Sequence, residues 1–237
     1  MTDTLLTKPS KFHINRSSKN WLIYENCDKM LLRYSNVYRG VLYDFGCGDA
    51  PYKEFFLQFA DQYIGVDWGE EGYYAANESI AADLNKPIPI ESEVADTIVS
   101  LSVMEHLYEP ENMLNEAFRI LKPNGTIVMQ VPWQWWIHDA PHDYFRYSPF
   151  GLKHMFEKAG FQDITVEPQN GFFSMWVLKF NYFTSRFIFG HKLFRWLVTA
   201  CLSPIWYLGQ LIAPSLDKLD RDWMLETSGY FVTGRKP

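Results

Sequence analysis

The chain has 237 residues, is 47% hydrophobic and carries a formal net charge of −6 at pH 7. This length fits one α/β domain with an elaboration, and the negative charge disfavours nonspecific binding to a nucleic-acid backbone. The three cysteines are far apart and the first residues are polar. We therefore expect no disulfide framework, no zinc site and no signal peptide, and a reducing, cytoplasmic location.

The predicted elements alternate between helix and strand. Residues 1–37 read as a tail followed by a helix at 18–34, which could lie across the ligand site as a lid. Next come a strand at 40–45, a helix at 51–60, strands at 63–67, 78–83 and 96–101, a helix at 110–121 and a strand at 126–131. A helix at 149–159 that ends at Gly160, a strand at 161–167 and a last strand at 229–234 complete the pattern. Such alternation predicts a doubly wound, mostly parallel sheet with its ligand at the carboxyl ends of the strands.

A glycine-containing turn follows the first predicted strand, at Gly46-Cys47-Gly48. Glycines at a strand-to-helix turn let the backbone approach a ligand closely. Asp67 ends the next strand along the chain, where a carboxylate can accept hydrogen bonds from both ribose hydroxyls of a nucleoside. The pattern therefore predicts an adenosine-containing cofactor.

The acidic residues of this turn favour one class of cofactor. Asp44 and Asp49 would repel a pyrophosphate, and Pro51 stands where dinucleotide-binding turns carry a third glycine. Carboxylates instead suit a ligand with a positive end, such as the ammonium and sulfonium groups of S-adenosylmethionine.

At these residues the sequence resembles the class I S-adenosylmethionine-dependent methyltransferases, and among them a bacterial group linked to small-molecule, lipid or surface-sugar methylation. The resemblance continues through 96–107 and 121–131, which match the fourth strand with its following loop and the turn leading into the fifth strand. It implies a Rossmann-like sheet of seven strands with an antiparallel last strand. It also assigns S-adenosylmethionine to Asp44, Gly46, Cys47, Gly48, Asp67, Trp68, Asp83, Leu84 and Ser100.

This resemblance divides the chain into a core at 38–167, an insert at 168–228 and a final core strand at 229–237. The insert is rich in aromatic residues, and Lys179, Arg186, Lys192 and Arg195 recur among them. Basic residues beside tryptophan, phenylalanine and leucine are typical of helices that lie on anionic membranes. Three alternatives stay open: contact with a membrane surface, a cap over the active site or a homodimer interface, and a true membrane span, which Pro204 and Pro214 would interrupt.

The loop after the fifth strand gathers groups that could act on a methyl acceptor. His142 is our first candidate for the base that removes a hydroxyl proton and His138 is the second, while His106, which follows the fourth strand, is a rival. Arg146 could hold a phosphate or carboxylate of the acceptor, and Tyr144 and Trp133 could also contact it. Each of these residues could equally serve only to hold the loop together, and no third ligand group supports a metal site.

The sequence thus predicts an O-methyltransferase that acts on a sugar or a membrane-linked metabolite, such as a surface polysaccharide or its lipid-linked precursor. A quinone or lipid methyltransferase is one alternative. A methyltransferase-like binding module that has lost catalysis and associates with membranes is another.

Overall fold

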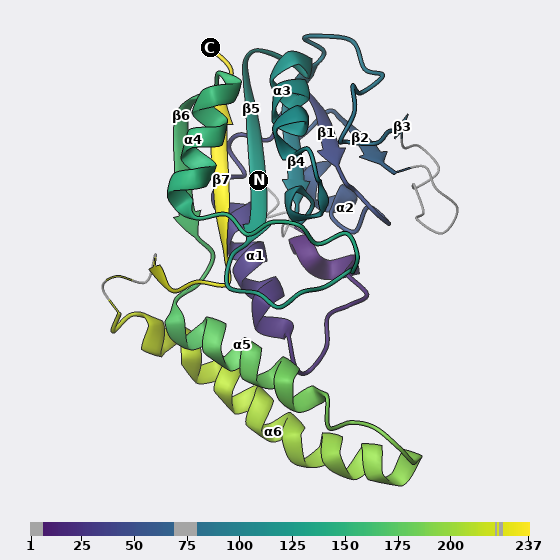
Figure 1. The fold of residues 1–237 in the computed structure, drawn as a ribbon, viewed down its shortest axis with the longest axis vertical. Helices are drawn as coiled ribbons and strands as arrows, with labels where there is room; N and C mark the ends of the chain where they lie inside the picture. Colours follow the sequence, from purple (N-terminus) through teal and green to yellow (C-terminus); the bar gives the residue numbers. More distant parts are fainter. Residues whose placement is uncertain (1–6, 69–79, 221, 223–224) are drawn as a thin grey trace, which may run out of the picture.

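Seven strands form one sheet in the order β3-β2-β1-β4-β5-β7-β6 (Figure 1). The computed structural model describes residues 7–68, 80–220, 222 and 225–237. The strands are β1 (Val41–Phe45), β2 (Gln62–Asp67), β3 (Ile80–Ala81), β4 (Ala95–Leu101), β5 (Leu121–Pro132), β6 (Gln162–Pro168) and β7 (Gly229–Arg235). The first five run parallel, and β7 is antiparallel to both β5 and β6. The predicted Rossmann-like sheet with an antiparallel last strand is confirmed.

Helices cover both faces of this sheet, as a largely parallel sheet requires. The helical segments are η1 (Pro9–Phe12), α1 (Trp21–Arg33), α2 (Lys53–Phe56), η2 (Met104–His106), α3 (Pro110–Ile120), α4 (Pro149–Ala159), α5 (Phe172–Ser185) and α6 (Lys192–Asp217). Buried side chains of α1 and α2 pack with Leu42, Val99 and Phe231 on one face. Those of α3 and α4 pack with Ile98 and Met129 on the other.

The predicted elements differ from the structure mainly at their ends. The helix expected at 51–60 is regular only over Lys53–Phe56, and turn hydrogen bonds continue it to Ala60. The strand expected at 126–131 begins earlier, at Leu121. Part of the strand expected at 78–83 lies outside the described residues, and the part that is described forms β3. At α4, the Ser148 hydroxyl accepts a hydrogen bond from the first turn and Gly160 ends the helix at φ +101°, as predicted.

Helix α1 is a layer of the fold and not a separate lid, which corrects the expectation for residues 18–34. Met30 and Leu31 are buried against the sheet. The N-terminal half of α1 also borders a cavity at the end of the sheet, through Ile23, Tyr24 and Cys27. The helix is amphipathic and its apolar face needs the sheet, because a helix of this length gains most of its stability from tertiary packing.

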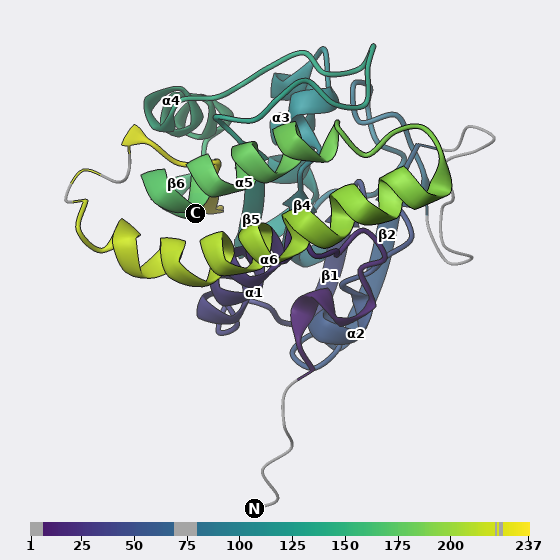
Figure 2. The same cartoon turned by 90° about the horizontal axis from the view of Figure 1, so that it is seen from below.

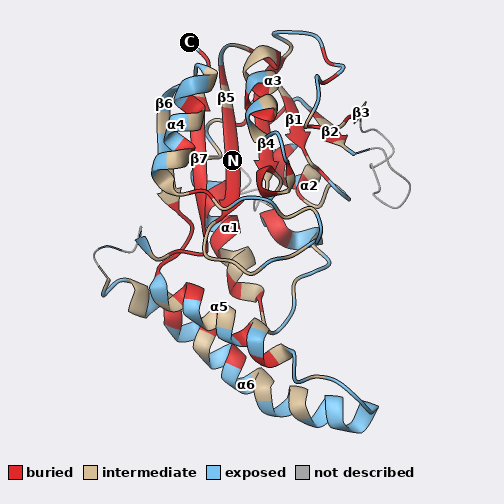
Figure 3. Cartoon of the chain, in the orientation of Figure 1, coloured by how far each residue is buried: buried red, intermediate tan, exposed pale blue. Residues whose placement is uncertain are grey.

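Helices α5 and α6 form a hairpin that lies across the carboxyl end of the sheet and extends away from it (Figures 1 and 2). Gln210 of α6 fixes the hairpin to α1, since its amide accepts from the Leu22 N–H (3.0 Å) and donates to the Ser18 carbonyl (2.8 Å). Trp206 is buried and donates to the Thr184 hydroxyl of α5 (2.9 Å). The hairpin therefore has a buried inner side and a largely exposed outer side (Figure 3).

Candidate functional site

The turn after β1 meets the end of β2 through a carboxylate. Gly46 and Gly48 both have positive φ values, +76° and +51°. The Gly48 N–H donates to one carboxylate oxygen of Asp67, and the Trp68 N–H donates to the other (2.6 Å). Asp67 is thereby held at the cavity that the turn lines, in the place predicted for a ribose-binding acid.

The two glycines are needed for different reasons. A Cβ on Gly46 would lie 2.3 Å from the Val103 side chain, so this position has no space for one. A Cβ on Gly48 would have no atom within 4 Å. Gly48 therefore leaves open space beside the cavity, which suits a ligand that approaches the backbone closely.

The Asp44 carboxylate lies beneath the turn and accepts a hydrogen bond from the Tyr63 hydroxyl (2.6 Å). Burial raises the pKa of Asp44 to about 7, and the nearby Asp67 adds to this, although the bond from Tyr63 opposes it. A buried acid poised near neutrality ionises readily when a cation binds beside it. Asp44 also borders a cavity on the other side of the turn, together with Asp49, Cys47 and residues of the segment 12–15.

The cavity at the turn encloses about 360 Å³. Its walls include the predicted contacts Trp68, Asp83 and Leu84, and on the opposite side His106, Asp139, His142 and Tyr144. The Asp83 carboxylate accepts from the Asn85 backbone and side chain and pairs with Lys86, and these bonds hold its pKa below the usual value although burial opposes them. With glycines, a ribose-type acid and the further carboxylate of Asp83 on a cavity of this size, the residues fit S-adenosylmethionine.

One of the predicted cofactor contacts, Ser100, does not line the cavity. Ser100 is fully buried inside the sheet, where its hydroxyl donates to the Phe45 carbonyl (2.9 Å) and joins β4 to β1. Ser102, just after the end of β4, lines the cavity instead. Cys47 is buried and borders the cavity that Asp44 also lines, beside Gly46 and Gly48, so its contact with the cofactor stays a prediction.

The loop after β5 brings its histidines to the turn after β4. The His106 Nδ1 atom lies 2.6 Å from the His142 carbonyl oxygen. A carbonyl can only accept, so Nδ1 carries the proton and the Nε2 lone pair points the other way. Burial lowers the pKa of His106, which keeps the ring neutral near pH 7. His142 lies further out, with its Nδ1 3.3 Å from the Tyr144 hydroxyl and its ring against Trp68.

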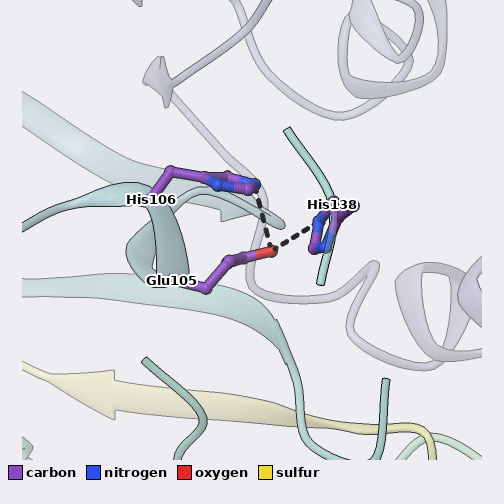
Figure 4. Close-up of side chains that lie close together, drawn as sticks. All are labelled: Glu105, His106 and His138. Atoms are coloured by element: carbon purple, nitrogen blue, oxygen red, sulfur yellow. Dashed lines mark ion pairs between the residues drawn. The ribbon is translucent and has the colours of Figure 1, made fainter. Parts of the chain in front are cut away.

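Glu105 lies between His106 and His138 (Figure 4). Its Oε1 atom is 3.6 Å from His106 Nε2 and 3.8 Å from His138 Nε2. The side chain is fully buried, and neither oxygen accepts a hydrogen bond from any residue that the structure describes. Burial raises the pKa of Glu105 to about 8; its own backbone N–H and the charge of Arg146 oppose the shift, and Asp143 and Asp139 add to it.

A second cavity of about 300 Å³ adjoins the first, because Ser102, His106 and Asp139 line both. Its other walls carry aromatic rings and amides from four parts of the chain: Tyr24, Tyr52, Gln130, Trp135, Gln169 and Tyr182. Among the described residues that line it, none is a lysine or an arginine. Tyr182 belongs to α5, so the inner side of the hairpin closes part of this cavity.

Two of the residues predicted to contact the acceptor, Arg146 and Trp133, make other contacts within the protein. The Arg146 guanidinium pairs with Asp143 and donates to the Trp136 carbonyl (3.0 Å), and the bond from Arg146 lowers the pKa of Asp143 to about 2. Arg146 thus holds the loop together. Trp133 packs against the sheet core, and Trp135 is the tryptophan that reaches the second cavity. Tyr144 lines the first cavity as expected.

Two acids of the site were not singled out from the sequence. Glu105 precedes His106 directly, but its burial and its place between two histidines depend on a loop that starts some thirty residues later. Asp139 borders all three cavities. The only sequence signal for either was adjacency to a histidine.

The chain is similar to known methyltransferases over part of its length. Residues 43–129 match the family model described as a methyltransferase domain. A protein of Mycolicibacterium smegmatis named as a probable S-adenosylmethionine-dependent methyltransferase is 26% identical over 93 residues, which is 37% of this chain and 36% of that protein. The chain thus matches little more than a third of that relative's length.

Solved structures share the fold over most of the chain. A SAM-dependent methyltransferase from Archaeoglobus fulgidus superposes with a TM-score of 0.56 at 18% identity, covering 90% of this chain and 94% of the other. Phosphoethanolamine N-methyltransferase 2 of Haemonchus contortus, in complex with S-adenosylmethionine, gives 0.58 at 17% identity over 93% of this chain and 56% of the other. The chain therefore has the Rossmann-like fold of these structures. Residues 43–129 are similar to a methyltransferase domain, and this similarity supports S-adenosylmethionine as the cofactor.

Proposed function

We propose that the protein is an S-adenosylmethionine-dependent O-methyltransferase whose acceptor is a sugar or a sugar-bearing, membrane-linked metabolite. One observation carries this proposal. The cavity between the Gly46–Gly48 turn and Asp67 shares a wall with a second cavity, and this wall holds His106 and Asp139. A cofactor site that adjoins a polar cavity is the arrangement that a transfer reaction needs.

When bound, S-adenosylmethionine supplies a methyl group whose bond to sulfur breaks as an acceptor oxygen bonds to its carbon, leaving S-adenosylhomocysteine, a methyl ether and one proton. The protein has to align the acceptor and remove that proton. His142 is the proposed base, because it lines the cofactor cavity and because the Tyr144 hydroxyl beside its Nδ1 can orient the ring.

The second cavity favours a neutral, hydroxylated acceptor group. Its aromatic rings can stack on the apolar face of a sugar, and its amides can pair with hydroxyls. The absence of lysine and arginine among its described lining residues argues against a phosphate bound within it. A phenolic ring would find the same stacking surfaces, so a quinone-type acceptor is the second candidate.

The hairpin supports placing the protein on a membrane surface. Residues 172–216 contain four basic residues and no aspartate or glutamate, whereas the whole chain has a net charge of −6. The hairpin exposes many large apolar residues: Trp176, Phe180, Phe183, Phe187, Phe189, Leu193, Phe194, Trp196, Leu197, Tyr207, Leu208 and Leu211. Aromatic and leucine side chains beside cations match the interface of an anionic membrane.

Among the described residues, α6 is the one helix long and apolar enough to cross a membrane, judged by length and composition alone. The hydrogen bonds that hold α6 to the rest of the protein argue against a membrane span. Gln210 and Trp206 hold α6 to α1 and α5, and a helix inserted across a bilayer would have to give up these hydrogen bonds. Docking of the outer side on the cytoplasmic face keeps them.

Two experiments test the proposal in sequence. Calorimetric titration with S-adenosylmethionine and S-adenosylhomocysteine should show one site per chain. Incubation with methyl-tritiated S-adenosylmethionine and fractionated lipids and glycans of the source cells should then label one fraction in an alkali-stable ether. Cofactor binding without labelling of any fraction would favour the binding module that has lost catalysis, and no binding at all would overturn the proposal.

A further inference from the structure

We propose that Glu105, His106 and His138 form a binding site for a divalent transition-metal ion at the wall between the two cavities. The inference deepens the proposed function, since the ion would face the acceptor, but metal binding can be measured without any methyl transfer. Figure 4 shows the two imidazole rings turned toward one carboxylate oxygen.

The hydrogen-bond pattern leaves three electron-pair donors facing one another. His106 donates its Nδ1 proton to the His142 carbonyl (2.6 Å). His138 Nδ1 faces the Trp136 carbonyl (3.3 Å) and the Asp143 carboxylate (3.4 Å), both of which can only accept. Each ring therefore presents an unprotonated Nε2 to Glu105 Oε1.

These separations are too long for hydrogen bonds and close to those of ligands around a metal. The N···O distances are 3.6 and 3.8 Å, and the three ligand atoms lie within 4.8 Å of one another. Ligands bonded at about 2.1 Å are roughly 3.0–3.4 Å apart in octahedral or tetrahedral sites. Small side-chain rotations would close the difference, and the two rings already meet edge to face at 4.8 Å between centroids.

Glu105 gives the second, independent reason to expect an ion. It is fully buried, and both of its oxygens lack a hydrogen-bond donor among the described residues. A buried polar group without a partner is costly, and an ion bridging it to the histidines would satisfy it. The carbonyl and carboxylate behind the two Nδ1 atoms are the outer partners that metal-bound histidines usually have.

The donor set indicates the class of metal. Two imidazoles and one carboxylate favour Zn²⁺, Fe²⁺, Co²⁺ or Mn²⁺ over Mg²⁺ or Ca²⁺, which prefer all-oxygen sites. Asp139 lies at the rim, with Oδ2 3.9 Å from His106 Nε2, and could supply a fourth ligand. His106 and His138 line the second cavity, so a remaining coordination position would face an acceptor hydroxyl there.

The test uses the full chain after treatment with a chelator. Titration with Co²⁺ should give visible d–d absorption at one ion per chain, displaced by Zn²⁺, and each metal should raise the melting temperature. Glu105→Gln and, as a second variant, His138→Asn should weaken Co²⁺ binding by about 100-fold or more, since loss of outer partners alone costs 10–100-fold. The matched control is His154→Ala, which removes an exposed histidine of α4 and should leave the spectrum unchanged.

Titration with S-adenosylmethionine, run on every variant, separates this inference from the proposed function and shows that each variant is folded. A wild-type protein that binds S-adenosylmethionine but shows neither absorption nor a thermal shift with Co²⁺ or Zn²⁺ would overturn the metal site. Full Co²⁺ binding by both Glu105→Gln and His138→Asn would overturn the ligand assignment.

Discussion

His106 donates its Nδ1 proton to the backbone carbonyl of His142 across 2.6 Å. This bond joins the turn after β4 to the loop after β5 and aims His106 Nε2 at Glu105. Because the acceptor is a main-chain atom, the bond survives replacement of the His142 side chain. The roles of the two histidines can therefore be separated by substitution.

His142→Ala should reduce turnover about 100-fold or more, the usual contribution of a general base. The variant retains the carbonyl that orients His106, so its affinity for S-adenosylmethionine should change little. Turnover is measured from initial rates with the acceptor that the tritium labelling identifies, and the affinity for S-adenosylmethionine is measured by calorimetry. Turnover within a few-fold of wild type would remove His142 as the base.

Asp67→Ala should weaken S-adenosylmethionine binding at least tenfold. The variant loses hydrogen bonds between a carboxylate and the ribose hydroxyls, each worth about 1.5–3 kcal/mol. Since Asp67 also accepts from the Gly48 and Trp68 N–H groups, circular dichroism and the melting temperature should be recorded with the titration. A folded variant with unchanged affinity would refute the ribose assignment.

The two glycines of the turn should respond differently to alanine. Gly46→Ala places a Cβ 2.3 Å from Val103 in a left-handed conformation, and overpacking together with backbone strain should destabilise the fold by at least about 2 kcal/mol. Gly48→Ala meets no neighbouring atom and should lose about 1 kcal/mol from its φ of +51°.

Urea unfolding of both variants, with calorimetry on Gly48→Ala, tests this contrast. Gly48→Ala should lose cofactor affinity while remaining folded, because its methyl group enters space beside the cavity. Equal unfolding free energies for the two variants would contradict the packing argument.

Cofactor affinity should rise with pH around neutrality. Asp44 has its pKa raised to about 7, so it is largely protonated below that pH and becomes an anion above it. The anion attracts the positive end of S-adenosylmethionine, so binding should strengthen between about pH 6 and pH 8. In Asp44→Asn, the dependence of cofactor affinity on pH reflects only the ligand and the other protein groups. The difference between the wild-type and variant curves therefore gives the contribution of Asp44. Identical curves would show that Asp44 does not act on the cofactor.

The same shift has a consequence for the protein without ligand. The folded-state pKa of Asp44 lies above its unfolded value of about 3.9, so its contribution to stability is complete below that value and is lost as pH rises through about 7. The free energy of unfolding of Asp44→Asn, minus that of wild type, should therefore be larger above pH 7 than at pH 5. Urea midpoints at the two pH values measure this.

The end of the α5–α6 hairpin that contains residues 186–196 should bind anionic vesicles. Each cation near such a surface contributes about 1 kcal/mol, and buried aromatic area supplies a part that resists salt. Replacing Arg186, Lys192 and Arg195 by glutamine should abolish the salt-dependent part, and replacing Phe194 and Trp196 by alanine should reduce the rest. Co-sedimentation with phosphatidylserine-containing vesicles at low and high salt gives both values.

Phe150→Ala is the matched control, since Phe150 is 80% exposed on α4 and lies outside the hairpin. Wild-type protein that stays in the supernatant at low salt would contradict membrane docking. Sedimentation equilibrium would then show whether the same apolar side forms a homodimer.

The sequence by itself determined the order and type of the core elements. Strong apolar runs such as Val41–Phe45 and the glycine turn after it depend on contacts near in sequence, so local pattern was enough to place the cofactor turn and Asp67. The end of α4 at Gly160 followed from capping chemistry for the same reason.

Only the tertiary structure decided which side chains near the ends of β4 and β5 face the cavities. The Arg146 guanidinium is held by Asp143 and the Trp136 carbonyl, and Ser100 is buried in the sheet whereas Ser102 lines the cavity. Glu105 and His138 meet because β4 and β5 are adjacent parallel strands, so the segments that follow them emerge at the same edge of the sheet. Sequence spacing carries no information on such a meeting, since it depends on loop paths and on long-range packing that no local pattern encodes.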